Sequence, residues 1–540
     1  MRPLLAVLAI ALTATVASAS GQQAPPPSYG EAVFLVSGRG WGHGVGMSQY
    51  GAYGQALAGR SYRQILGYYY SGTTIGKAGR KEVRVLLAEG RRAVTVSSGK
   101  PLTAVDATGA SYPIAKGAVT VHADLLVPTS EGAVTAASPL VIRPAKKALL
   151  ALDGRPYRGK LELVPQGEFL RVVNVVPLES YIQGVVAGEM PFGWPAEALK
   201  AQAVAARSYA LANLLKGKPY DLYSDQRSQV YLGVAGEKAS TTQAVTATAG
   251  EVVLYGGRVA TTYYFSTSGG KTASAADVFG FSVPYLVSRP DPWDTLSPYH
   301  EWGPVLLGAR TVQSKLELDG RVLDATGTAT PSGRLRALVL ATTTGSESVP
   351  ASVVRTALGL RSTWISLGVL RLDKPTGGPI VFGSTMHLAG IGRGLGTPRL
   401  ASSPDGTFWS PVRALTPDAA GAVALDVKPV RITRYRLEAE GGASPAMLVE
   451  VAPRIALSRP TAAEPAVLAG TVRPRLPGGV VALERRKGTA WVTLGEATVD
   501  ASGAFRLVLA TAVPTGSYRA RISATSGLAA GTSPVLQVMG

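Results

Sequence analysis

A repeat in the C-terminal part of the chain limits the possible folds more than any other feature of the sequence. Segments with Gly-Thr-x-Trp, Asp-Ala-x-Gly-Ala and Tyr-Arg occur twice, and the second copies follow the first by 82, 82 and 83 residues. The copies are Gly406–Trp409 and Gly488–Trp491, Asp418–Val423 and Asp500–Phe505, and Tyr435–Arg436 and Tyr518–Arg519. This period is the size of an immunoglobulin-like β-sandwich. We therefore expect two such all-β modules, at residues 376–453 and 454–540, each with one buried Trp and a Tyr on a late strand.

The preceding part of the chain mixes strand and helix patterns. From Glu82 to about Leu178, short Val- and Leu-rich runs alternate with Gly-containing turns, which indicates antiparallel β structure. The strongest helical pattern is Pro195–Leu215, whose expected apolar face holds Leu199, Ala203, Ala206 and Ala210. These patterns predict an α+β domain at residues 31–375 with a β-rich insert at 80–175, ending near the Pro- and Gly-containing segment 374–378.

The N-terminus resembles an export signal. Arg2 is followed by the apolar run Leu4–Val16 and by Ala17-Ser18-Ala19, a typical cleavage site. We expect residues 1–19 to be a signal peptide and residues 20–30 a Pro-rich linker, with an uncleaved membrane anchor as the alternative. No other apolar stretch is long enough for a transmembrane helix, so we expect no transmembrane anchor after cleavage and a secreted or wall-associated product.

The net charge and the absence of cysteine limit the classes of partner, metal and cofactor that the chain can bind. The chain has 54 Lys and Arg against 35 Asp and Glu, a net charge of +19, which favours a polyanionic partner. Export makes nucleic acid an unsuitable candidate and leaves anionic wall polymers. The absence of cysteine excludes disulfides, thiol nucleophiles and Cys-ligated zinc, and we expect neither a metal nor a cofactor.

Two segments are dense in unusual residues. Residues 34–75 contain alternating glycines around His43, and residues 175–211 place Glu189 between a Val- and Gly-rich stretch and Met190-Pro191. Burial among apolar neighbours raises the pKa of a carboxyl group, as a general acid near neutral pH requires. Glu189 is therefore the candidate catalytic residue.

At these two segments the chain resembles the stage II sporulation protein D family, also called SpoIID/LytB. The resemblance continues through five further segments and covers about residues 31–370. These segments are 225–231, 263–280, 284–294, 332–340 and 355–364. The two C-terminal repeats lie outside it.

The resemblance implies a peptidoglycan lytic transglycosylase that cleaves the bond between N-acetylmuramic acid and N-acetylglucosamine and leaves 1,6-anhydro ends. Glu189, in the family's Glu-Met-Pro element, would be the acid/base. Other residues in matching motifs would contact the glycan strand or offset charge near Glu189: His43, Ser48, Gln49, Lys200, Arg207, Gln229, Tyr231 and Ser268. For each, a loop-stabilising role is the alternative, and Arg207 would then be a buried structural cation. Part of the family consists of amidase enhancers, so a cell-wall amidase is a second expected partner.

The resemblance leaves the geometry of the site and the role of the protein open. In the founding sporulation proteins the Gly-His motif follows the glutamate segment, whereas here it precedes it, so the position of His43 relative to Glu189 is open. A conventional glycosidase would need a second carboxylate, for which Glu179, Asp225, Asp277 and Asp291 are candidates. A non-catalytic enhancer and a structural wall protein are also compatible with the sequence. The tyrosines at 68–70 would either stack on sugars or pack in the core.

Overall fold

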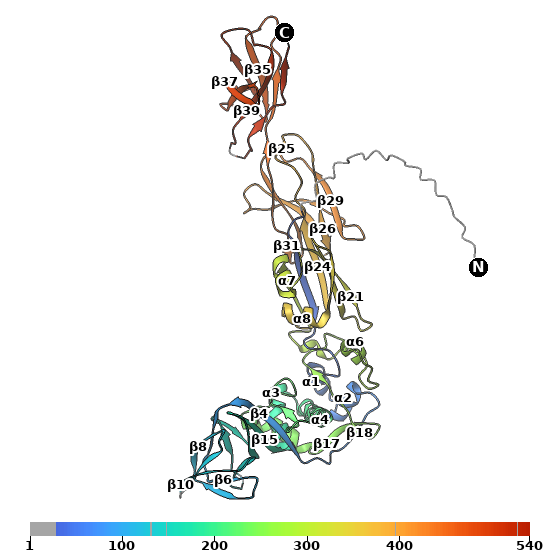
Figure 1. Ribbon diagram of the computed structural model, residues 1–540. Helices are drawn as coiled ribbons and strands as arrows, with labels where there is room; N and C mark the ends of the chain where they lie inside the picture. Colours follow the sequence, from blue (N-terminus) through green and yellow to red (C-terminus); the bar gives the residue numbers. More distant parts are fainter. Residues whose placement is uncertain (1–28, 130–131, 147, 395, 526, 540) are drawn as a thin grey trace, which may run out of the picture. The chain divides into compact units, whose positions relative to one another are not determined.

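The computed structural model describes residues 29–129, 132–146, 148–394, 396–525 and 527–539 (Figure 1). The predicted signal peptide lies outside this range, as does most of the predicted linker. Contacts between Cα atoms divide the chain into two compact units, one of residues 34–369 and one that contains residues 370–540. Each unit is described separately below.

The β-rich insert of the first unit forms two sheets around one core. Their strands pair antiparallel, except that residues 222–223, from outside the insert, add a parallel edge strand. A seven-stranded sheet has the order β16-β4-β15-β14-β11-β6-β7, and a four-stranded sheet has the order β13-β12-β5-β8. Alternate residues of β4, such as Val83 and Val85, point into this core and are fully buried. The strands of the two sheets are β4 (Glu82–Arg91), β5 (Ala93–Ser98), β6 (Leu102–Val105), β7 (Ser111–Ile114), β8 (Gly117–His122), β11 (Leu140–Pro144), β12 (Leu150–Leu152), β13 (Arg155–Tyr157), β14 (Lys160–Gln166), β15 (Phe169–Pro177) and β16 (Leu222–Tyr223).

A group of helices packs beside the seven-stranded sheet (Figure 1). The central helix α4 (Ala196–Ala212) contacts α1 (Gln49–Leu57), α2 (Tyr62–Tyr69), α3 (Leu178–Glu189) and α5 (Ala239–Ala247). The four residues predicted for its apolar face are buried. Most other positions of this helix are buried as well, including Arg207, because alanines on several sides let neighbouring helices approach closely. Pro195, the first residue of the predicted helical segment, is the N-cap of α4.

The glycine-rich loop after β1 (Val33–Arg39) is held by segments much later in the chain. Its β2 (Met47–Ser48) pairs in parallel with β19 (Tyr264–Phe265), so that Tyr264 lies opposite Met47. Gly46 has φ +81°, and an added Cβ would overlap the carbonyl group of Tyr263. The loop therefore requires glycine at this position, because an L-residue would be strained and would collide with the neighbouring backbone.

The rest of this unit consists of short strands and short helices outside the two sheets and the helix group described above. β1 pairs between β20 (Glu301–Gly308) and β24 (Ile365–Leu372), and β21, β22 and β23 form a separate sheet. Its remaining elements are β3 (Thr74–Lys77), β9 (Leu126–Thr129), β10 (Gly132–Thr135), β17 (Glu251–Tyr255), β18 (Arg258–Val259), α6 (Ala275–Phe279), α7 (Ala309–Leu316), β21 (Val322–Ala329), β22 (Leu335–Thr342), β23 (Ser346–Pro350) and α8 (Ala351–Leu358).

The second unit contains two modules with matching strand arrangements. In the first, β26 (Met386–Arg393) pairs with β29 (Ala422–Val427), and a second sheet has the order β28-β27-β30-β31. In the second, the sheets have the orders β34-β35-β38 and β37-β36-β39-β40. A further strand pairs with β30 in the first module and with β39 in the second. The strands of these sheets are β27 (Arg399–Ser403), β28 (Ser410–Ala414), β30 (Thr433–Ala439), β31 (Gly442–Ala443), β32 (Met447–Val449), β34 (Arg454–Ser458), β35 (Val467–Arg473), β36 (Val480–Lys487), β37 (Ala490–Thr498), β38 (Ala504–Val508), β39 (Gly516–Ile522), β40 (Gly531–Thr532) and β41 (Leu536–Val538).

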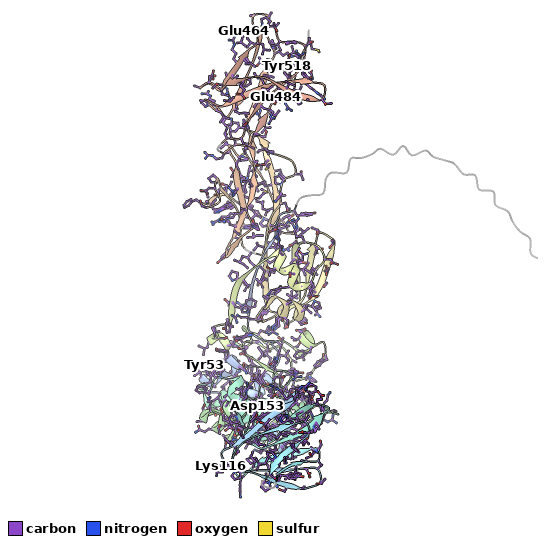
Figure 2. All side chains as sticks on the ribbon, turned by 60° about the vertical axis from the view of Figure 1, so that its left-hand side comes forward. Tyr53, Lys116, Asp153, Glu464, Glu484 and Tyr518 are labelled. Atoms are coloured by element: carbon purple, nitrogen blue, oxygen red, sulfur yellow. The ribbon has the colours of Figure 1, made fainter. Side chains whose placement is uncertain are left out.

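Both repeated tyrosines are core residues of these modules. Tyr435 on β30 and Tyr518 on β39 are buried, and the Tyr518 hydroxyl donates to the Pro514 carbonyl oxygen 2.6 Å away (Figure 2 labels Tyr518). A tyrosine that bonds to backbone a few residues upstream is typical of immunoglobulin-like sandwiches. The predicted fold class, an α+β domain followed by two sandwich modules, is confirmed.

The prediction of a buried Trp in each module is wrong. Trp409 and Trp491 are partly exposed and lie beneath the guanidinium groups of Arg436 and Arg519, at 3.9 and 4.3 Å from the ring centroids. The sequence contains the Trp and the Arg of each pair, but the repeat alone does not tell which face of the sheet carries them.

Candidate active site around Glu189

Glu189 is the last residue of α3. The helix ends there because Met190 precedes a proline, which disfavours helical conformation, and Met190 is extended with φ −133° and ψ 138°. The carboxyl group thus sits at the negative end of the helix dipole, where an anion is disfavoured. Its position alone favours the protonated form.

The surroundings of Glu189 act on its pKa in both directions. Burial raises the pKa, whereas hydrogen bonds from the Val230 N–H and the Tyr264 hydroxyl lower it, and the net effect is a raised pKa. Tyr181 and Tyr209 also lie near the carboxyl group. Burial raises the pKa of both phenols, and the charge of Glu189 adds to this rise. Glu189 is therefore a half-buried carboxyl group, surrounded by phenols, that holds its proton at a higher pH than an ordinary glutamate.

Gln229 fixes the direction of the hydrogen bonds around Glu189. The Tyr181 hydroxyl donates to Gln229 Oε1 at 3.1 Å, and Gln229 Nε2 donates to the Tyr264 hydroxyl at 2.8 Å. Gln229 Nε2 also donates to the Ala206 carbonyl at 3.2 Å, which anchors it to α4. Because the Tyr264 oxygen already accepts from Gln229, its proton is free to be donated to Glu189.

His43 is connected to Glu189 through Tyr264. Its Nδ1 accepts from the Val45 N–H at 3.1 Å, and the ring bonds to the backbone of Tyr264. Burial and the charges of Arg355 and Arg334 lower the pKa of His43 to about 4, so the ring is neutral at neutral pH. Although the two motifs occur in reversed order along the chain, His43 and Glu189 both contact Tyr264. Tyr264 was not among the residues proposed from the sequence.

Ser48 and Ser268 belong to a separate buried cluster around two aspartates. The Ser268 hydroxyl donates to Asp294 Oδ2 at 2.8 Å, and Ser48 caps α1 by accepting from the Gly51 N–H at 3.1 Å. The Tyr69 hydroxyl donates to Asp291 Oδ1 at 2.9 Å. Burial and the charge of Asp294 raise the pKa of Asp291 to about 6. Both serines are fully buried, a position that favours the loop-stabilising role.

The remaining candidates are also bonded within the protein. Arg207 is fully buried, and its Nη2 lies 2.6 Å from Glu179 Oε2, as expected of a structural cation. Lys200 Nζ lies 2.6 Å from Glu197 Oε1. The other two contacts are Tyr231 hydroxyl to Asn174 Oδ1 at 3.0 Å and Gln49 Nε2 to Gln202 Oε1 at 3.4 Å.

The four carboxylates considered as partners of Glu189 are each bonded elsewhere. Glu179 binds Arg207, Asp225 binds Arg227, Asp277 accepts from the Ser332 N–H, and Asp291 accepts from Tyr69. Across the described residues, no three His, Asp or Glu side chains are placed to hold a metal ion. The arrangement thus offers one carboxyl group with hydrogen-bond donors around it.

An aromatic cluster follows Glu189 along the chain. Trp194 stacks on Tyr53 of α1, with ring centroids 4.6 Å apart and an angle of 16°, and it meets Tyr50 edge-on (Figure 2 labels Tyr53). Phe192 lies in the sequence between Glu189 and Trp194, and its side chain is 54% exposed. The three tyrosines at 68–70 are less accessible than Phe192. Tyr69 and Tyr70 are buried in the core, and the Tyr68 hydroxyl donates to the Pro290 carbonyl.

Comparison with known proteins places this site in a family. A family model described as stage II sporulation protein matches residues 166–255, which include Glu189 and Gln229. The stage II sporulation protein D of Bacillus amyloliquefaciens is 32% identical over 248 residues, which are 42% of this chain and 67% of that protein. The chain belongs to the stage II sporulation protein D family.

Further relatives match shorter parts. The amidase enhancer of Bacillus subtilis (strain 168) is 34% identical over 179 residues, 33% of this chain and 23% of that protein. An uncharacterised protein of Brachyspira hyodysenteriae is 42% identical over 161 residues, 28% of this chain and 44% of that protein. The chain therefore spans less than half the length of these two members.

Among solved structures, the titin fragment A168–A169 aligns with 30% of this chain and 94% of its own length, at 17% identity and a TM-score of 0.16. That likeness is too weak to add to the strand orders given above. Within the part of the chain that the structure describes, no helix is both long and apolar enough to cross a bilayer.

Proposed function

We propose that this protein is an exported peptidoglycan lytic transglycosylase with Glu189 as its general acid and base. The observation that carries the proposal is the raised pKa of Glu189 together with its hydrogen bonds from Val230 and Tyr264. A general acid works best when its pKa lies near the working pH, and an ordinary glutamate is too acidic for this.

The proposed reaction needs one carboxyl group used twice. Protonated Glu189 gives its proton to the glycosidic oxygen as the bond from that oxygen to the muramic C1 breaks. The Glu189 carboxylate then removes the proton from the C6 hydroxyl of the same sugar, whose oxygen forms the new bond to C1. The products are a free 4-hydroxyl end and a 1,6-anhydromuramic end, no water is consumed, and Glu189 returns to its protonated form.

The surrounding residues suit both halves of this cycle. The Val230 N–H and the Tyr264 hydroxyl bind the carboxylate form and thereby limit the rise of its pKa. Without them the proton would be held too tightly to be given up. Neutral His43 orients the Tyr264 segment through its backbone contact. These residues are positioning residues, whereas Glu189 is the group that meets the substrate.

The proposed setting is the bacterial cell wall. The net charge of +19 would hold the protein on anionic wall polymers. The two sandwich modules would bind the wall or act as spacers for the first domain. Both roles agree with a secreted or wall-associated location. The peptidoglycan glycan strand is the proposed substrate, and a cell-wall amidase is the proposed second partner.

A second function, a non-catalytic amidase enhancer, is favoured by one observation. A relative with that printed name is 34% identical over 179 residues. In that case the protein would bind wall or amidase and Glu189 would be dispensable.

Mass spectrometry of digests separates the two functions. Peptide-free glycan strands are incubated with the wild type, with Glu189→Gln and with Glu197→Gln, a control whose carboxylate pairs with Lys200. We expect 1,6-anhydromuramic products from the wild type and from Glu197→Gln but not from Glu189→Gln. Equal yields from all three, or none from the wild type while it still stimulates an amidase, would overturn the catalytic proposal.

A further inference from the structure

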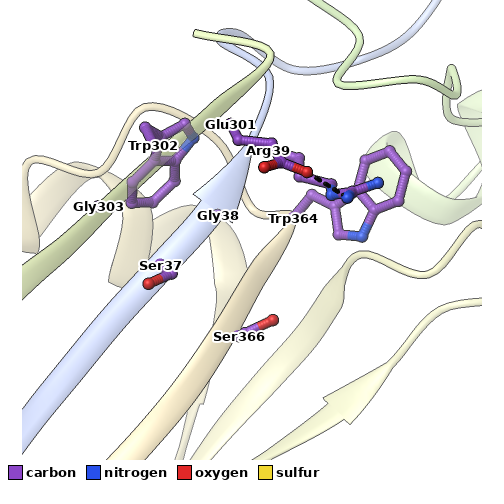
Figure 3. Close-up of a pocket in the computed structure, with 8 residues that line it drawn as sticks. All are labelled: Ser37, Gly38, Arg39, Glu301, Trp302, Gly303, Trp364 and Ser366. Atoms are coloured by element: carbon purple, nitrogen blue, oxygen red, sulfur yellow. Dashed lines mark hydrogen bonds and ion pairs between the residues drawn. The ribbon is translucent and has the colours of Figure 1, made fainter. Parts of the chain in front are cut away.

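A pocket of about 560 Å³ lies where β1, β20 and the start of β24 pair (Figure 3). Its lining residues come from three distant parts of the sequence: Ser37, Gly38, Arg39, Glu301, Trp302, Gly303, Trp364 and Ser366. All lie outside residues 166–255, which the family model matches. The pocket is separate from the cluster around Glu189, and its volume falls within the roughly 300–1,000 Å³ of ordinary ligand sites.

Some side chains at this pocket are available to a ligand, whereas others support the backbone around it. Residues two apart on a strand share a face, so Ser37 and Arg39 point to one side of β1. Arg39 forms an ion pair with Glu301, and Figure 3 shows this pair between the two tryptophans. Trp302 packs against Gly38, where an added Cβ would overlap its ring, and its Nε1 donates to the Gly40 carbonyl at 2.9 Å. Trp302 is thus a support, and Gly38 is required for its placement.

The charge balance of the pocket selects a class of ligand. Arg39 and Glu301 are the charged residues among those that line the pocket, and they pair with each other. The nearby Arg334 donates to the carbonyl oxygens of Ser268 and Lys271, so the lining offers no unpaired cation for a phosphate or a carboxylate. The lining residues offer the guanidinium of Arg39, the carboxylate of Glu301, the two serine hydroxyls and the ring of Trp364. The centroid of that ring lies 5.8 Å from Arg39 Cζ and 5.3 Å from Arg334 Cζ, so the ring contacts a ligand only beside these two guanidinium groups. Paired donors and acceptors match neighbouring hydroxyl groups, and an aromatic ring packs against aliphatic C–H groups. A neutral pyranose has both.

We infer that this pocket is a saccharide subsite that binds a neutral pyranose unit of a glycan strand at a distance from Glu189. β1 leads directly from Arg39 into the loop of His43, and four residues span at most about 14 Å. Between them lies Trp41, which is 41% exposed and packs edge-on against Tyr299 at 4.7 Å. The identity of the glycan as the strand that Glu189 cleaves rests on the proposed function, whereas the sugar-binding chemistry of the pocket does not.

The Arg39–Glu301 pair is a suitable target because it contributes little to folding. Its side chains are 47% and 63% exposed, and exposed ion pairs contribute little to stability. A matched control exists on the β-rich insert, where Arg92 and Glu168 form a pair 3.1 Å apart with exposures of 73% and 75%. Ser366 is exposed as well, so a large residue at this position would fill the pocket without disturbing the core.

The test is calorimetric titration of the full chain with chitohexaose, a neutral chain of N-acetylglucosamine, in the Glu189→Gln background. Arg39→Ala with Glu301→Ala, and separately Ser366→Trp, should each weaken binding at least about tenfold, because charged hydrogen bonds or the space itself are lost. Arg92→Ala with Glu168→Ala should bind as the parent does.

Three results would overturn the inference: no binding by the parent, unchanged binding by both pocket variants, or equal weakening by the control pair. Activity assays separate this outcome from failure of the proposed function. If the wild type releases no anhydro products yet the pocket variants lose chitohexaose binding, the subsite stands and the catalytic proposal falls. If the wild type releases anhydro products and the pocket variants bind chitohexaose as the parent does, the catalytic proposal stands and the subsite falls.

Discussion

Replacing Tyr264 with Phe removes one hydroxyl group that binds the Glu189 carboxylate. The hydroxyl stabilises the charged form, so its loss destabilises the carboxylate and raises the pKa of Glu189. A hydrogen bond to a charged group is worth about 1.5–3 kcal/mol, and about 1.4 kcal/mol corresponds to one pH unit. Because Glu189 keeps its bond from Val230 and part of its solvent contact, we expect the lower end, a rise of about one pH unit.

Two measurements follow this change. Carbon-13 NMR of labelled glutamate reports the titration of the Glu189 side chain directly. If Glu189 is the general acid, the alkaline limb of the kcat/KM profile should also move to higher pH by the same amount. Tyr209→Phe is the matched control, since Tyr209 lies near Glu189 and interacts with its charge without a hydrogen bond to it. An unchanged or lowered pKa in Tyr264→Phe, or an equal rise in both variants, would refute the reasoning.

Three further predictions concern stability. The pKa of Asp291 is about 6 in the folded protein against 3.8 for an ordinary aspartate, so folding favours its protonated form and the wild type loses about 3 kcal/mol as the pH rises through this window. Asp291→Asn lacks this loss, so its unfolding free energy relative to wild type should increase between pH 4 and pH 7 in urea titrations, and a constant difference would contradict the assignment. Gly46→Ala should destabilise the protein by about 2 kcal/mol or more, because φ is +81° and the new Cβ overlaps the Tyr263 carbonyl. Gly188→Ala, inside α3 with its nearest neighbouring atom at 3.4 Å, should stabilise it by about 0.5–1 kcal/mol in the same assay.

The sequence was most informative where function and fold depend on local patterns. The helix at Pro195–Leu215 was predictable because its apolar residues recur at helical spacing, and α4 covers Ala196–Ala212. Glu189 became the candidate catalytic residue because its sequence neighbours are apolar and because it lies in the Glu-Met-Pro element of the family that the chain resembles. Its place at the end of α3 was not predicted. The two sandwich modules followed from a repeat whose copies keep the same order of motifs.

Features that depend on distant pairing were not predictable in this way. Tyr264 reaches Glu189 because β19 pairs with β2, and no local pattern around residue 264 indicates that partner. Ser48, Ser268 and Arg207 looked like substrate contacts because they are polar residues in matching motifs, but they are buried and bonded inside the protein. The pocket at Arg39 combines three segments whose proximity depends on sheet order alone.

Digestion in water labelled with oxygen-18 tests the central claim most directly. Peptide-free glycan strands are incubated with the wild type in labelled water, and the new muramic ends are analysed by mass spectrometry. The account predicts anhydro ends without label, because the attacking oxygen is the sugar's own C6 hydroxyl, and no such ends with Glu189→Gln. New reducing muramic ends in place of anhydro ends, in excess of those in an enzyme-free control whose reducing ends exchange oxygen with the labelled water, would show that water is the nucleophile and would contradict the account.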